Sequence, residues 1–110
     1  MIVCGTATEN SDLNYDLTPL TLLYKNYPNP FNPETTLSFT LAKNSRATLK
    51  IYNQKGQLVK TLIDADLPSG DYQYVWNGKD NKGISVASGV YLYSLIAEGE
   101  THLRKMLLLK

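Results

Sequence analysis

The sequence has one cysteine, one histidine and almost no excess of charge of either sign. Cys4 has no second cysteine with which to form an intramolecular disulfide, and it sits far from the patterned part of the chain. This excludes a disulfide scaffold and argues against a zinc site. Lysine plus arginine number 11 against 10 aspartate plus glutamate, a net charge of +1. Such a chain has no field to attract a polyanion, so we expect no nucleic-acid partner.

Residues for catalysis are equally scarce. General acid–base chemistry most often uses histidine, and nucleophilic catalysis needs a nucleophile next to a base. The only histidine, His102, lies in an alternating segment where a surface strand position is expected. GxSxG, HExxH and glycine-rich phosphate motifs do not occur. We therefore expect no enzyme activity, no cofactor, no resident metal and no small-molecule substrate.

Long apolar runs are also missing. No stretch approaches the roughly 18 apolar residues of a membrane helix, and residues 1–5 lack the basic start and apolar run of a secretory signal peptide. If the chain is exported, we expect that signal in an upstream part of a longer protein. Residues 1–16 are small and polar without a sustained period, which indicates a leader or linker, and residues 17–110 are expected to form one domain.

Alternation of apolar and polar residues is what the chain does contain. Eight tyrosines and 43% hydrophobic residues favour half-buried sheet surfaces. No segment predicts an amphipathic helix. The pattern predicts an all-β, seven-stranded, antiparallel β-sandwich of the immunoglobulin or fibronectin-III type. The predicted strands are 17–24, 36–41, 48–52, 57–63, 72–76, 90–96 and 101–110.

Proline and glycine mark the connections between these strands. Pro19 predicts that the first strand lies at a sheet edge. Three prolines in residues 27–33 predict a stiff, extended crossover in which Phe31 plugs into the core. Residues 53–56 end in Gly56 and predict a hairpin turn, residues 64–71 are expected to interrupt the strand pattern, and residues 77–83 predict a tight loop.

Two groups of polar or aromatic side chains admit more than one interpretation. The turn residues offer oxygens of the kind that calcium binds, but their spacing is not that of an EF-hand, and the same residue types favour turns without metal. Tyr72, Tyr74 and Trp76 share one strand face and could stack on a sugar, although packing in the core of a central strand is the simpler interpretation. The turn residues are Asp64, Asp66, Asp71, Asn77, Asp80 and Asn81.

The end of the chain is apolar on both faces and bracketed by cations. It reads Lys105, Met106, Leu107, Leu108, Leu109, Lys110. One interpretation is a final strand with both faces covered. The other is an exposed apolar edge that a partner protein pairs with by adding a strand.

Five blocks in order carry a resemblance to a known family. They are residues 26–36 (NYPNPFNPETT), 51–53 with 56–59 (IYN, GQLV), 76–80 (WNGKD), 87–91 (ASGVY) and 105–110 (KMLLLK). From about Leu20 to Lys110 the chain resembles a type A C-terminal sorting domain of the bacterial type IX secretion system. It is also similar to the immunoglobulin-like domain of the flagellar hook-capping protein.

The resemblance implies a non-catalytic module at the C-terminal end of a larger exported protein. Such a module has as partners the upstream cargo domain, the outer-membrane secretion machinery and a sortase-like peptidase. The cargo passes through the periplasm and ends on the outer-membrane surface, joined to lipopolysaccharide, or outside the cell. The implied recognition block is Lys105, Met106, Leu107, Leu108, Leu109 and Lys110. The implied structural residues are Asn29, Pro30, Phe31, Gly56, Trp76, Gly89 and Tyr91. Asn77 stands where the family pattern has aspartate, which weakens a metal proposal at that loop.

Two further functions stay open at this stage. The domain could be a passive structural spacer, as in a hook cap. A carbohydrate-binding accessory module is the third possibility, and it would depend on Trp76. The cargo and the oligomeric state cannot be read from the sequence.

Overall fold

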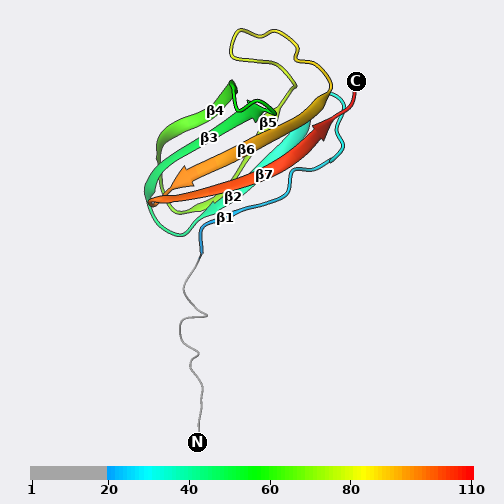
Figure 1. Cartoon of the computed structure of the whole chain (residues 1–110). Coiled ribbons are helices and arrows are strands. Elements are labelled where there is room, and N and C mark those ends of the chain that lie inside the picture. The colour runs from blue at the N-terminus through cyan, green and yellow to red at the C-terminus, as the bar shows by residue number, and fades with distance from the viewer. Residues whose placement is uncertain (1–19) are drawn as a thin grey trace, which may run out of the picture.

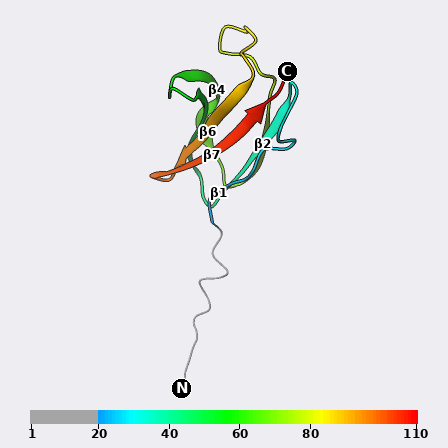
Figure 2. The same cartoon turned by 45° about the vertical axis from the view of Figure 1, so that its right-hand side comes forward.

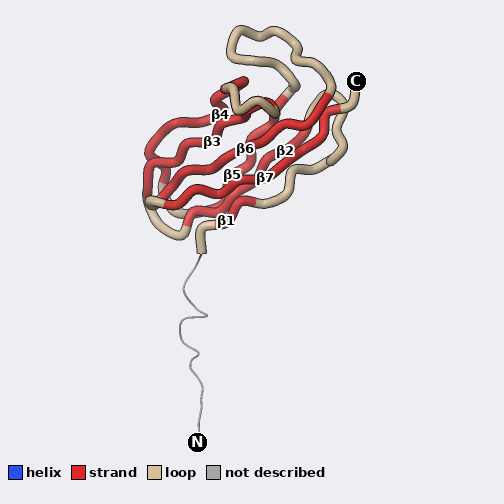
Figure 3. The backbone as a smooth tube through the Cα atoms, viewed as in Figure 1, coloured by secondary structure: helices blue, strands red, loops and turns tan. Residues whose placement is uncertain are grey.

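Strands with alternating apolar and polar residues pair into two antiparallel sheets that face each other (Figures 1 and 3). The computed structural model describes residues 20–110. One sheet has the order β1-β2-β5 and the other the order β4-β3-β6-β7. The all-β, seven-stranded sandwich predicted from the sequence is confirmed. The strands are β1 (Leu22–Leu23), β2 (Thr35–Leu41), β3 (Ser45–Asn53), β4 (Leu58–Leu67), β5 (Gly70–Trp76), β6 (Gly89–Ala97) and β7 (Glu100–Leu108).

The core lies between the sheets and is built from every second residue of the long strands. Because successive side chains of a strand point to opposite faces, the apolar set of each strand goes inward. The buried apolar positions of these strands are Leu37, Phe39 and Leu41 of β2; Ala47, Leu49 and Ile51 of β3; Tyr91, Tyr93, Leu95 and Ala97 of β6; and Met106 and Leu108 of β7. Leu23, Phe31, Val59 and Trp76 complete the buried apolar set.

All seven strands differ from their predicted bounds by at least one residue, and the differences at β4, β1 and β7 have structural consequences. The strand expected to end at residue 63 continues to Leu67, because Asp64 and Asp66 pair with Thr48 and Arg46 of β3 and keep an alternating pattern with apolar neighbours. Within the described residues the first strand is only Leu22–Leu23, although its edge position is confirmed. The last strand ends at Leu108, two residues before the chain does.

Two other predictions concern the place of a strand within its sheet and the place of the domain boundary. The strand of Tyr72, Tyr74 and Trp76, expected to be central, is an edge strand, since β5 pairs only with β2. The predicted domain boundary between residues 16 and 17 lies outside the described residues.

The crossover between β1 and β2 runs beside β7, far from it in sequence (Figures 1 and 2). Phe31 forms a parallel bridge with Leu108, and its side chain is 2% exposed. The expected role of Phe31 as a core plug is confirmed. The prolines on either side explain the geometry, because they favour extended backbone and remove donors that would otherwise need partners.

Candidate functional site

The terminal strand β7 divides its side chains between core and solvent. Met106 and Leu108 are 2% and 0% exposed and form part of the core. Lys105 and Leu107 alternate with them and therefore point to the outer face of the sheet. Leu109 lies beyond the strand and is exposed. A partner that meets the folded domain can thus reach only part of the predicted recognition block.

The outer backbone edge of this strand is already occupied where the strand ends. The Leu107 amide donates to Asn29 Oδ1 at 3.1 Å, and the Leu107 carbonyl accepts from the Phe31 amide at 3.0 Å. The Leu109 amide donates to the Phe31 carbonyl at 3.0 Å. The Lys110 amide donates to Ser88 Oγ at 3.0 Å. A new strand could therefore pair with the tail only by displacing the segment that carries the buried Phe31.

An aromatic cluster beneath the tail joins three of the implied structural residues. Trp76 lies 5.6 Å from Phe31 and 5.3 Å from Tyr91, measured between ring centroids. The Trp76 Nε1 donates to the Lys79 carbonyl at 2.8 Å, and the side chain is fully buried. The sugar-platform interpretation of Trp76 is therefore wrong, and core packing is confirmed. Buried aromatic rings with a satisfied polar handle contribute strongly to packing.

The other ring positions of the same strand support that conclusion. Tyr72 and Tyr74 are half-buried and stack on Phe39, with centroid distances of 5.3 and 6.0 Å. Tyr72 also donates to the Pro68 carbonyl at 2.6 Å. These rings cover the core where β5 forms the sheet edge.

Two glycines have positive φ angles at turns, where any other residue would have a strained backbone. Gly56 has a φ of +82° and its amide donates to the Asn53 carbonyl at the end of the β3–β4 turn, as the hairpin prediction expected. Gly78, with a φ of +75°, lies so close to the crossover that an added Cβ would meet the Pro33 carbonyl oxygen at 3.2 Å. The remaining implied structural residues are exposed Pro30 in the crossover and Gly89, which opens β6 opposite Leu108.

The side-chain oxygens of the 77–83 loop accept hydrogen bonds from backbone amides. Asp80 Oδ1 accepts from the amides of Lys82 and Ile84, each at 2.9 Å. Asn77 Oδ1 accepts from the Lys79 amide, and Asn81 Oδ1 accepts from the Thr61 amide. Across residues 20–110, no three metal-ligating side chains gather. The turn interpretation of these residues is the one that the hydrogen bonds support.

Asp64, which the sequence placed beside a turn, lies in β4 on the surface of the four-stranded sheet. Asp64 accepts from Arg46 Nε and Thr48 Oγ1, each at 3.1 Å. The Thr48 hydroxyl and the Arg46 guanidinium lower the pKa of the Asp64 carboxyl. His102 contacts Glu100 at 3.1 Å on the surface, in the strand position expected for it.

Burial changes the pKa of three tyrosine hydroxyls. Burial raises the pKa of Tyr93, Tyr91 and Tyr74 above the ordinary value of 10.0. The Tyr93 hydroxyl donates to the Tyr24 carbonyl at 2.7 Å, and that of Tyr91 to the Ala87 carbonyl at 2.6 Å. Both groups serve as protonated donors that fix the fold.

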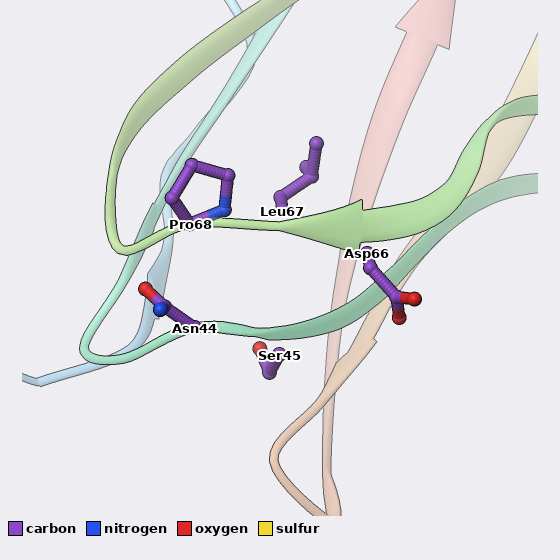
Figure 4. A pocket seen from close by; sticks show the side chains of 5 residues that line it. All are labelled: Asn44, Ser45, Asp66, Leu67 and Pro68. Atoms are coloured by element: carbon purple, nitrogen blue, oxygen red, sulfur yellow. The ribbon is translucent and has the colours of Figure 1, made fainter.

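Two hollows on the surface are open to solvent. One of about 420 Å³ lies between the β2–β3 connection and the β4–β5 corner, where the side chains of Asn44, Asp66 and Leu67 do not converge (Figure 4). Asn44 Oδ1 there accepts from the Ser69 amide at 2.8 Å. A smaller hollow of about 210 Å³ lies beside the tail and is lined by Asn29, Val90, Lys105, Met106 and Leu107.

Sequence reasoning missed the residues that lie next to the tail across the sheet. β6 pairs with β7 so that Val90 stands opposite Leu107 and Leu92 opposite Lys105. Tyr52 of β3 in turn stands opposite Leu92. Alternation could have shown that these side chains point outward, but only the register places them beside the tail. In the described part of the chain no helix is long and apolar enough to cross a membrane.

Comparisons with solved structures agree on the fold. Latent, dimeric PorU of Porphyromonas gingivalis is 19% identical, with a TM-score of 0.62 over 81% of this chain and 9% of that chain. PorZ of the same organism, described as an essential bacterial surface component of the type-IX secretion system, is 22% identical, with a TM-score of 0.54 over 92% of this chain and 13% of that chain. The chain thus spans only a small part of either protein.

Flagellar protein FlgD provides a further match. FlgD of P. aeruginosa is 26% identical, with a TM-score of 0.52 over 67% of this chain and 59% of that chain. No curated protein sequence matches the chain. Residues 28–100 match the family model described as the FlgD Ig-like domain, which is a non-catalytic module, and they include the aromatic cluster of Phe31, Trp76 and Tyr91. The chain therefore belongs to the FlgD Ig-like domain family.

Proposed function

We propose that this domain is a non-catalytic sorting module. It targets a larger exported bacterial protein to the type IX secretion machinery for passage across the outer membrane. The cargo is then attached to the cell surface or released. The implied partners are the outer-membrane machinery, a sortase-like peptidase and the upstream cargo domain.

One observation carries the proposal. The terminal strand is held firmly in a folded sandwich, yet it displays Lys105 and Leu107 on the outer face of the sheet and leaves Leu109 exposed. A cation and apolar side chains on a paired strand form a surface that a receptor can bind without unfolding the domain. The likeness to part of PorZ, a surface component of that secretion system, supports the proposal at the level of fold.

The test is an export assay. A reporter enzyme with its own secretory signal is fused to residues 1–110 in a bacterium that has the machinery. We expect the reporter at the cell surface or in the medium, and in the periplasm when the module is omitted. Retention of the complete fusion in the periplasm would refute the proposal.

A structural spacer is the second candidate, and the family match favours it. The matched residues 28–100 end before the tail block, so the fold common to the family does not require a sorting signal. The FlgD domain of P. aeruginosa is therefore the matched control in the export assay. If that domain exports the reporter equally well, the sorting signal is not specific to this chain and the spacer function is preferred.

A further inference from the structure

The direction of the backbone groups along β5 follows from the bonds of its neighbour β2. Thr36 of β2 exchanges backbone hydrogen bonds with Tyr27, at 2.9 and 3.0 Å. The Ser38 carbonyl accepts from the Tyr24 amide at 3.0 Å. Both residues therefore point toward the β1 side. Because successive residues of an antiparallel strand direct their backbone groups to opposite sides, the residues between them, such as Leu37, bond to β5.

Alternate residues of β5 consequently direct their backbone groups to the open side of the sheet. Tyr72 and Tyr74 pair with the β2 residues that point toward β5. The amides and carbonyls of Asp71, Gln73 and Val75 then face away from β2, where no further strand follows among residues 20–110. No hydrogen bond from those described residues reaches these backbone groups. We call the backbone groups of Asp71, Gln73 and Val75 the free edge.

The other sheet edges are engaged by side chains or loops. On β4, Asn81 bonds to the Val59 carbonyl and the Thr61 amide, each at 3.1 Å. On β1, Arg104 Nε donates to the Leu23 carbonyl at 2.7 Å. The crossover occupies the edge of β7, as described above. Proteins commonly protect exposed edges with proline, lysine or bulges, whereas β5 has neither proline nor lysine and pairs with β2 without a register shift.

The core is incompletely covered where β4 passes beyond β5. Because β1 is bonded to β7, the sheets are in line on that side, and β4 at the other side has no counterpart in the three-stranded sheet (Figure 1). Ile63 of β4 pairs with the buried Leu49 and therefore points inward, and Leu67 lies on the same face. Both are only partly buried, as are Tyr72 and Tyr74 of β5. An apolar border of the core thus lies beside the free edge.

We propose that the free edge of β5 binds an extended segment of a protein of the secretion machinery by strand addition. The added segment would become the fourth strand of the smaller sheet. Its backbone would bond to Asp71, Gln73 and Val75, and its alternate apolar side chains would point inward to Ile63 and Leu67. The inference rests on the proposed sorting function and deepens it, because it identifies a contact for the machinery besides the tail.

The number of strands selects a single segment over a second folded copy of the chain. The larger sheet extends one strand beyond the smaller one at the free edge. If two copies paired through β5, each β4 would lie above the smaller sheet of the other copy, where the larger sheet of that copy already packs. A lone extended segment has no second layer and avoids this collision. A lipid surface offers no row of backbone donors and acceptors with which the free edge could pair.

The experiment uses the reporter fusion and removes one N–H of the free edge. Gln73→Pro deletes an amide that points away from β2, and proline is tolerated at such edge positions. We expect surface delivery to fall at least about tenfold, because a ladder bond is lost and the proline ring obstructs the added strand. Gln73→Thr keeps the N–H and suits a strand, so it is the matched control and should be delivered like the unmodified fusion. Val75→Pro removes a second N–H of the free edge and should behave like Gln73→Pro.

Folding and self-association are measured on the purified chains. The thermal unfolding midpoint of each proline variant should lie within about 5 °C of the unmodified value. A larger fall in both variants would overturn the proposal, because it would show that these N–H groups already bond within the chain. Sedimentation should find the unmodified chain monomeric. A dimer that Gln73→Pro dissociates would overturn the proposal in favour of a second copy.

The delivery assay separates this inference from the proposed function. Delivery of the unmodified fusion, together with equal delivery of both proline variants, would refute the free edge as a docking site and leave the sorting function standing. Periplasmic retention of the unmodified fusion would refute both.

Discussion

Two side chains fasten the short strand β1 to the opposite sheet. The Tyr93 hydroxyl of β6 donates to the Tyr24 carbonyl, and Arg104 Nε of β7 donates to the Leu23 carbonyl, each at 2.7 Å. A two-residue strand forms too few ladder bonds to be held by pairing alone. These hydrogen bonds between the sheets therefore fix the side of the sandwich where the described chain begins.

Replacing Tyr93 by phenylalanine should lower the free energy of unfolding by about 1 kcal/mol, since one buried hydrogen bond is lost. The substitution should also change the alkaline response. Because the pKa of Tyr93 is raised in the folded state, its contribution to stability is complete below its ordinary value of 10.0 and is lost as the pH rises beyond it. Urea unfolding between pH 8 and 11 should show a smaller alkaline loss for Tyr93→Phe. Identical alkaline slopes would contradict the assignment.

Strand β7 has one face that packs in the core and one face that points to solvent. Its inward residues Met106 and Leu108 complete the core above Phe31, while Lys105 and Leu107 face outward. A truncation that removes residues 105–110 therefore removes core and surface together. Point substitutions of the outward residues are the cleaner test of recognition.

A chain that ends at Arg104 should lose about 3 kcal/mol or more of unfolding free energy. Removal of the buried Met106 and Leu108 side chains leaves a cavity and exposes Phe31, and losses of this size follow deletion of large core residues. Urea unfolding of the purified chain measures the effect. Lys110→Ala, which leaves both buried residues in place, serves as the control. An unchanged midpoint for the truncated chain would mean that the tail does not belong to the core.

Alternation predicted most of the strands and the inward role of residues such as Leu37 and Leu49, whereas the inward role of Phe31 followed from its being the large apolar residue of the proline-rich crossover. It failed for Asp64 and Asp66, because their partners Thr48 and Arg46 come from another strand and allow charged residues to continue the ladder. The tail was singled out because it is apolar on both faces between two lysines, and its recognition role was implied by the resemblance to a family. Its neighbours on the outer face were missed because register between strands depends on pairing that no local pattern encodes.

The sandwich as a single body has one core, shared by both sheets. Among the described residues its apolar members extend from Leu23 to Leu108. A core of this kind unfolds as one cooperative unit in most small domains. The predicted leader of residues 1–16 should therefore contribute little to folding.

Deleting residues 1–16 should change the unfolding free energy by no more than about 0.5 kcal/mol, as is usual for changes outside the packed core. Urea unfolding of residues 17–110 beside the complete chain provides the measurement. A clearly lower midpoint would place the start of the domain earlier than residue 17.

The bridge between Phe31 and Leu108 also determines how the domain responds to tension. The described chain begins at one pole of the sandwich and ends at the other (Figure 1). The crossover and β7 run parallel where they meet, so a pull between the two ends of the described chain loads the bonds of Leu107 and Leu109 in shear. Bonds loaded in shear must break together rather than in sequence. Resistance to forced unfolding, which depends on the unfolding rate, should therefore exceed what the thermodynamic stability alone suggests.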